Sequence, residues 1–144
     1  MLEFFKLNLR SIQHSKTRLL FMSSLCPEGS QRNVYKIIND NRIILFMKGD
    51  PLHPLCGFSR GAVQILQSYG VNDFKYVDVL QDEEVRKEIK IFSRWPTFPQ
   101  LYVNGEFIGG FDILRELHNS NELKKIFEKV KNNNESKKAD GKKQ

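Results

Sequence analysis

One cysteine at the expected start of a helix carries most of the chemistry that this sequence offers. Cys56 opens the segment Cys56-Gly57-Phe58-Ser59, between a proline-containing loop and apolar residues at helical spacing. The N–H groups and dipole at a helix N-terminus stabilise negative charge, which favours the thiolate. Because a thiolate is both nucleophile and metal ligand, Cys56 is our candidate for both roles, although a buried loop cysteine fits the position equally well. Ser59 replaces the second cysteine of a Cys-x-x-Cys pair and is expected to cap the helix.

Few other residues offer thiol or metal chemistry. The sequence has one other cysteine, Cys26, which lies far from Cys56 along the chain. A disulfide scaffold is therefore excluded, and we assign Cys26 no role. His14, His53 and His118 are scattered without partners at metal-ligand spacing, so no zinc site is expected. Thiol chemistry in the folded part therefore depends on Cys56.

The charge of the chain sits at its two ends. The 144 residues carry a net charge of +6, of which residues 1–25 contribute +3 and residues 129–144 contribute +4, leaving −1 for residues 26–128. A nearly neutral middle argues against a nucleic-acid-binding core. No apolar run approaches the length of a membrane span, and 40% hydrophobic residues suit one folded core. We expect neither nucleic acid nor a membrane as a partner.

Composition divides the chain into three segments. Residues 1–30 are basic, poor in acid and mixed with phenylalanine, leucine and serine, which is typical of an organellar transit segment. We expect a mitochondrial protein, with a plastid-type organelle or an unaddressed cytosolic extension as the alternatives. Residues 31–130 are expected to form the folded domain. Residues 131–144 are rich in Lys and Asn and are expected to be disordered.

Hydrophobic periodicity predicts helices and strands in alternation. Strands are expected at 43–47, 74–79, 100–103 and 106–108. Helices are expected at 31–41, at 59–69, and after Asp82, Asp112 and Asn119, which can act as their N-caps. Asn104-Gly105 predicts a type I′ turn joining the last two strands into a hairpin. The order predicts an α/β fold with a mixed four-stranded sheet flanked by helices on both faces.

Four motifs, taken together in their order along the chain, resemble those of the monothiol (CGFS-type) glutaredoxins. They are Met47-Lys48-Gly49, Cys56-Gly57-Phe58-Ser59, Trp95-Pro96-Thr97-Phe98-Pro99-Gln100 and Gly109-Gly110-Phe111-Asp112. The similarity extends over residues 31–130, about seven-tenths of the chain. The resemblance implies a thioredoxin-like (glutaredoxin) fold with Pro99 as a cis-proline. It also implies glutathione binding and a bridging [2Fe-2S] cluster.

The resemblance also implies which residues hold glutathione. Lys48 and Arg86 would face the glycyl carboxylate, although Arg86 also fits a surface arginine with no ligand. The backbone of Phe98 would pair with the cysteinyl unit as in strand addition. The N–H groups of Phe111 and Asp112 would receive the γ-glutamyl carboxylate. The Asp112 side chain would accept from the ligand ammonium, act only as a helix cap, or do both.

Counting thiols extends this interpretation to the cluster. A [2Fe-2S] cluster usually takes four thiolates, and one positioned cysteine per chain supplies two in a dimer. Two bound glutathiones would supply the others, so a cluster-bridged homodimer that passes clusters to iron–sulfur acceptor and scaffold proteins is expected. The alternative is a glutathione-dependent thiol–disulfide oxidoreductase with Cys56 as nucleophile. A third possibility is a binding module without redox chemistry. We do not expect a robust enzyme.

One residue departs from the family pattern at the expected glutathione site. Many glutaredoxins of this type have a cysteine where this chain has Phe111. That cysteine can pair with the CGFS thiol when the protein is oxidised. We therefore expect no disulfide of this kind here, whereas carboxylate binding through the backbone N–H of Phe111 should persist.

Overall fold

Four strands form one sheet in the computed structural model of the protein, which describes residues 30–139. The strands are β1 (Ile43–Met47), β2 (Lys75–Asp78), β3 (Gln100–Val103) and β4 (Glu106–Gly109). The helices are α2 (Ser30–Asn39), α3 (Gly57–Ser68), α4 (Glu83–Ser93), α5 (Phe111–Asn119) and α6 (Glu122–Ala139). The expected transit segment and the last residues of the expected tail lie outside the described residues. None of the described helices is long and apolar enough to cross a membrane.

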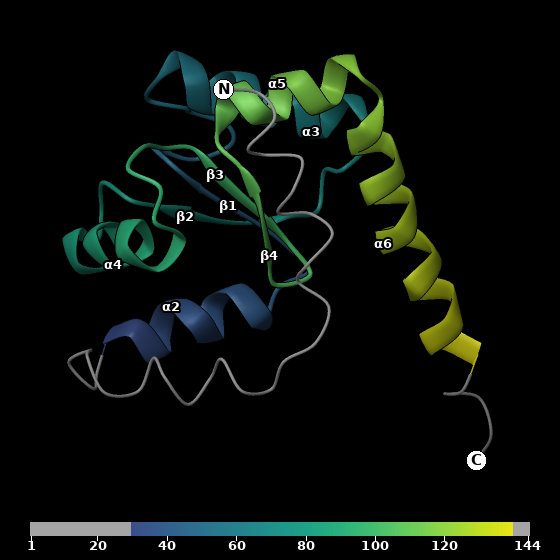
Figure 1. Cartoon of the computed structure of the whole chain (residues 1–144), viewed down its shortest axis with the longest axis horizontal. Helices are drawn as coiled ribbons and strands as arrows, with labels where there is room; N and C mark the ends of the chain where they lie inside the picture. Colours follow the sequence, from purple (N-terminus) through teal and green to yellow (C-terminus); the bar gives the residue numbers. More distant parts are fainter. Residues whose placement is uncertain (1–29, 140–144) are drawn as a thin grey trace.

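The sheet is mixed, as the sequence predicts. Its strand order is β2-β1-β3-β4, with β1 and β2 parallel and the other neighbouring pairs antiparallel. Asn104 and Gly105 between β3 and β4 have φ values of +50° and +83°, which confirms the left-handed turn expected there. Figure 1 shows α3 and α5 on one side of the sheet and α2 and α4 on the other.

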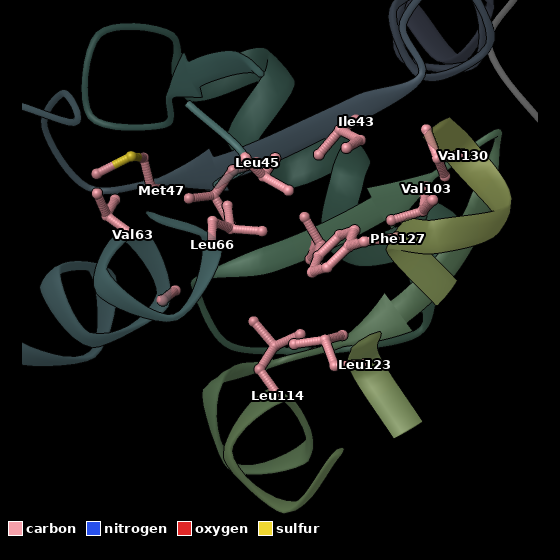
Figure 2. Close-up of a cluster of buried hydrophobic side chains, with 13 residues drawn as sticks. Ile43, Leu45, Met47, Val63, Leu66, Val103, Leu114, Leu123, Phe127 and Val130 are labelled. Atoms are coloured by element: carbon pink, nitrogen blue, oxygen red, sulfur yellow. The ribbon is translucent and has the colours of Figure 1, made fainter. Parts of the chain in front are cut away.

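The central strand β1 is buried along its whole length because helices cover both faces of the sheet. Alternate residues of β1 enter two different cores. Ile43, Leu45 and Met47 face a core shared with α3, α5 and α6. Ile44 and Phe46 face a core shared with α2 and α4. Figure 2 shows side chains of α6 joining the first of these cores, with the phenyl ring of Phe127 directed toward the strands.

The starts of α5 and α6 differ from the sequence prediction, whereas the start of α4 agrees with it. Asp82 is the N-cap of α4, as expected, because its carboxylate accepts a hydrogen bond from Val85 N at 3.0 Å. Asp112 is not a cap, since α5 already begins at Phe111 with Gly110 as its N-cap. The two glycines before Phe111 let the backbone turn directly into the helix. Asn119 is the last residue of α5, so it does not cap α6.

Helix α6 is also longer than the sequence predicts. Helix α6 continues to Ala139, whereas the sequence places the end of the domain at residue 130 and disorder from residue 131. The buried residues Leu123, Phe127 and Val130 anchor the first turns. Once a helix has been nucleated, each further residue adds a hydrogen bond, and the Lys, Glu and Ala of this segment favour helix. Its Lys- and Asn-rich composition therefore does not mark the end of the helix.

Candidate functional site

The sheet topology gathers the candidate residues at one end. Strands β1 and β2 are parallel and finish at the same edge, where Lys48 follows β1 and the helix carrying Arg86 follows β2. Strand β3 is antiparallel to β1, so Phe98 enters β3 at that same end. Strand β4 is antiparallel to β3 and therefore finishes there too, immediately before Phe111 and Asp112. Segments about 60 residues apart in sequence thus meet around one edge (Figure 1).

Cys56 itself is the N-cap of α3, in extended conformation with φ −149° and ψ 156°. Its sulfur accepts a hydrogen bond from Ser59 N at 3.3 Å, and its thiol donates to Ser59 Oγ at 3.1 Å. Ser59 is therefore not the cap that the sequence predicts, because Cys56 precedes the first helical residue and Ser59 lies within the first turn. The sulfur atom is held against the N–H groups of the helix start, where negative charge is stabilised. Cys56 remains partly exposed.

The Ser59 hydroxyl links the cysteine to the strand that precedes it. Its side chain is fully buried, and its oxygen also accepts a hydrogen bond from Lys48 N at 3.1 Å. One hydroxyl therefore contacts both the residue expected to bind a carboxylate and the thiol. This role fixes the start of α3 relative to the end of β1.

Asp78, at the end of β2, fixes the loop that follows β1. Its Oδ1 accepts hydrogen bonds from Gly49 N at 2.9 Å and from Leu80 N at 3.0 Å. Gly49 has a φ of +83°, and a Cβ there would lie 2.5 Å from the carbonyl oxygen of His53. Glycine is therefore required for the loop to fold back on itself.

The N-terminus of α5 lacks a side-chain cap. Gly110 supplies the N-cap position, and no side chain accepts from the N–H groups of the first turn, which include those of Phe111 and Asp112. A Cβ at Gly110 would lie 2.8 Å from Trp95 Nε1 and 3.4 Å from the carbonyl oxygen of Pro99. The helix start is thus packed closely against the loop that contains the cis Phe98–Pro99 peptide bond, which agrees with the cis-proline implied by the resemblance.

Phe111 connects the starts of α5 and α3. Its ring centroid lies 5.6 Å from that of Phe58, and the guanidinium of Arg115 lies 5.8 Å from the same ring. A Cβ at Gly61 on α3 would overlap the Phe111 ring. The ring of Phe111 is therefore accommodated by a glycine on the neighbouring helix.

The basic residues expected at the site differ in their partners. Lys48 is half-buried and forms no ion pair with any of the side chains described between residues 33 and 130, so its ammonium is available to an anion. Arg86 Nη1 lies 3.2 Å from Glu83 Oε2 on its own helix. Asp112 Oδ1 lies 3.5 Å from Arg115 Nη2, with both side chains exposed. Arg86 would have to exchange its partner in order to bind a ligand carboxylate.

Sequence reasoning missed three contributors to the site. Asp78 could have been found as a carboxylate at the end of a strand parallel to β1, where it meets the loop after β1. The bridging contacts of Ser59 leave no sequence signal beyond a small hydroxyl residue after Cys56. Gly61 is one glycine within an apolar helix, and only the position of Phe111 explains it.

Known proteins are similar to this chain in sequence and in fold. A sequence model described as glutaredoxin matches residues 43–108. The chain is 43% identical over 106 residues to "Glutaredoxin-related protein 5, mitochondrial" of Danio rerio, covering 74% of this chain and 68% of that protein. It is 44% identical over 117 residues to "Monothiol glutaredoxin-5, mitochondrial" of Schizosaccharomyces pombe, covering 80% of each.

Solved structures of glutaredoxins have a fold similar to that of this chain. The solution structure of reduced poplar apo GrxS14 matches with a TM-score of 0.61 at 44% identity, covering 69% of this chain and 90% of that one. The crystal structure of the buckwheat glutaredoxin–glutathione complex matches with a TM-score of 0.59 at 16% identity, which shows the fold alone, over 78% of this chain and 93% of that one. The thioredoxin-like glutaredoxin fold is confirmed, and the chain belongs to the monothiol glutaredoxin family.

Proposed function

We propose that the protein binds glutathione and carries a [2Fe-2S] cluster between two copies of the chain, acting as a cluster carrier in iron–sulfur biogenesis. The observation that carries this proposal is the meeting of three features at one end of the sheet. They are a thiol on the α3 N-terminus, an ammonium that forms no ion pair with the described side chains, and a helix start that none of these side chains caps. Together they complement a peptide with a thiol and two carboxylates.

The residues present fit glutathione. Lys48 binds the glycyl carboxylate, and Arg86 joins it after leaving Glu83. The backbone N–H groups of Phe111 and Asp112 receive the γ-glutamyl carboxylate at the open start of α5. The Phe98 backbone, at the entry to β3, pairs with the cysteinyl unit as an added strand.

The cluster requires a second chain. In the part of the chain that the structure describes, Cys56 is the one free cysteine, and no group of three or more His, Cys, Asp or Glu could hold a metal ion. Two copies of Cys56 and two glutathione thiolates together supply the four sulfur ligands that such a cluster takes. Because half of these ligands exchange with free glutathione, the cluster can be passed to acceptor and scaffold proteins.

The relatives also support a location. Two of them are described as mitochondrial, and residues 1–30 have the composition of a transit segment. We therefore place the protein in the mitochondrion. Residues 1–30 fused to a fluorescent reporter should direct it to that organelle, and a diffuse cytosolic signal would contradict the assignment.

A thiol–disulfide oxidoreductase is the second candidate, favoured by the partly exposed sulfur of Cys56. The Cys56 thiolate would attack the glutathione sulfur of a protein–glutathione disulfide, forming a new disulfide and releasing the protein thiolate. A second glutathione thiolate would then attack that disulfide, giving oxidised glutathione and free Cys56. Cys56 is the one cysteine among residues 30–139, so turnover by the described domain depends on this external thiol.

Anaerobic reconstitution of the full chain separates the two candidates. With iron, sulfide and glutathione, the wild type should give coloured dimers, measured by visible absorption and by mass in solution. Cys56→Ser should lose the colour and remain folded, because serine can also cap α3. Cys26→Ser is the matched control and should keep the colour. A colourless wild-type monomer with rapid turnover in a glutathione-coupled disulfide assay would instead establish the enzyme.

A further inference from the structure

Three large apolar side chains within four residues of Cys56 along the chain are exposed. Leu52, Leu55 and Phe58 expose 84%, 66% and 59% of their surface, and we call them the apolar collar. They lie on the loop between β1 and α3 and on the first turn of α3 (Figure 1). The other exposed large apolar side chains of the described residues are spread over other segments: Tyr35, Tyr76, Leu80 and Ile91. Grouped exposed apolar residues mark interaction surfaces, whereas single ones are ordinary.

The loop that presents the collar is held in a defined conformation. Asp50 Oδ1 accepts hydrogen bonds from Leu52 N at 2.7 Å and from His53 N at 2.8 Å. Leu55 N donates to Lys48 O at 2.9 Å, which closes the loop at its base. The hydrogen bond from His53 N lowers the pKa of Asp50, so the carboxylate stays ionised and bonded at neutral pH. The two leucines are therefore ordered in exposed positions, which reduces the entropy lost on binding.

The collar lies in a segment that suits self-association. Residues 51–59 contain no Asp, Glu, Lys or Arg, in a chain of which 28% of residues are charged. In a two-fold symmetric contact each residue near the axis meets a copy of its own surface, so any charge there would meet a like charge. An uncharged apolar segment avoids that repulsion, whereas a surface for an unlike partner gains from complementary charge.

We infer that the apolar collar of one copy packs against the collar of a second copy when the two chains share a cluster. This inference rests on the proposed function. Two Cys56 sulfurs that bind one small cluster must both lie close to the two-fold axis. Leu55 and Phe58 lie one and two residues from Cys56 along the chain, so they would also lie close to that axis.

The collar alone is too small to hold a dimer together. A stable interface buries about 800 Å² on each partner, contributed by about 20 residues or more, and three side chains fall well short of this. The protein without cluster should therefore be monomeric. The cluster joins the two chains, and contacts between the two collars lower the dissociation constant of the cluster-bound dimer.

The full chain tests the inference, as wild type, as Leu52→Ser/Leu55→Ser and as the matched control Ile91→Ser. Ile91 exposes 64% of its surface, a fraction similar to that of Leu55, and it lies on α4 rather than in the collar. Each protein is reconstituted anaerobically with iron, sulfide and glutathione, and dimer dissociation is followed by sedimentation at the visible absorption of the cluster. The double variant should dissociate at a concentration at least about tenfold higher than wild type, whereas Ile91→Ser should match wild type. Thermal melts of the three cluster-free proteins check that folding is equal.

The outcomes separate this inference from the proposed function. Coloured wild-type dimers together with an equally stable double variant overturn the inference alone. The same is true if the double-variant dimer is unchanged but transfers its cluster more slowly to an apo-ferredoxin probe, because the collar then serves an unlike partner. A colourless wild-type monomer overturns the proposed function and this inference with it.

Discussion

Helices α4 and α5 both begin at the edge of the sheet where the site lies, but their N-termini differ in the groups that satisfy them. Helix α4 has Asp82 as its cap, with a hydrogen bond to Val85 N, and Glu83 and Glu84 in its first turn. Helix α5 has Gly110 at the cap position and no side-chain acceptor. Carboxylates of the chain itself complement the positive end of α4, whereas α5 keeps its end open to an anion.

Helix α3 is intermediate between these two. It has no acidic residue in its first turn, and its cap is the sulfur of Cys56. A thiol is a weaker acceptor than a carboxylate, so the α3 start is satisfied less fully than the α4 start. The comparison indicates that α4, which carries Arg86, has a strong cap, whereas α3 and α5, which carry the thiol and the open N–H groups, have weak or absent caps.

Gly110→Ala should have the largest effect on the open end. Its Cβ would enter the space occupied by Trp95 Nε1 and push the start of α5 away from the Pro99 loop. We expect a loss of about 2 kcal/mol in the free energy of unfolding and a glutathione affinity at least about tenfold lower. Denaturant unfolding and calorimetric titration with glutathione measure the two effects. Unchanged glutathione affinity would show that the α5 start does not bind the ligand.

Asp82→Ala is the control for that variant, because it removes the side-chain cap of α4 and leaves the start of α5 unchanged. It should cost about 1 kcal/mol of stability. Its glutathione affinity should fall by much less than that of Gly110→Ala in the same titration, because the start of α5 is intact and Arg86 is still present. A parallel loss of affinity would mean that any destabilisation at this edge weakens binding, and the contrast between α4 and α5 would not hold.

A double-mutant cycle at Gly61 and Phe111 tests how the two helices of the site are held together. Gly61→Ala should cost about 2 kcal/mol because the methyl group overlaps the Phe111 ring. Phe111→Ala should cost a similar amount through lost packing with Phe58 and Arg115. The double variant should lose less than the sum by about 1 kcal/mol, since the added methyl then fills vacated space. Additive losses in denaturant unfolding would contradict the direct contact.

Glu88→Gln should have the smallest effect and probes the acidic character of α4. Burial, followed by repulsion from Glu84 and Asp82, raises the pKa of Glu88 in the folded protein. The ionised side chain therefore costs stability at neutral pH, and glutamine should raise Tm at pH 7 by no more than about 4 °C. The gain should shrink as pH falls through the folded-state pKa of Glu88, because the glutamate then protonates. A gain that is independent of pH would exclude this electrostatic cause.

Much of the fold followed from local sequence patterns. The apolar run of β1 and the Asn104-Gly105 turn were predicted correctly, as was the Asp82 cap, because each depends on neighbouring residues. The caps expected at Asp112 and Asn119 were wrong, because α5 already begins at Phe111, after two glycines, and because Asn119 still belongs to α5. The end of α6 was also missed, because propagation of an anchored helix outweighed composition.

At the site, sequence motifs identified residues but gave few of their contacts. Lys48, Arg86 and Phe111 were named as candidates by resemblance, and the structure places all three at one edge of the sheet. The ion pair of Arg86 with Glu83 and the bridging position of Ser59 came only from the structure. Their roles toward glutathione remain predictions that the titrations above test.

The sequence by itself determined the family, the position of the thiol and the alternation of strands and helices, because these depend on residue types and on spacing along the chain. Tertiary structure decided which helix starts are capped, why Gly61 accompanies Phe111, and that the apolar collar is exposed rather than buried. These features depend on contacts between segments far apart in the chain. Such contacts exist only once the sheet has brought those segments to the same edge.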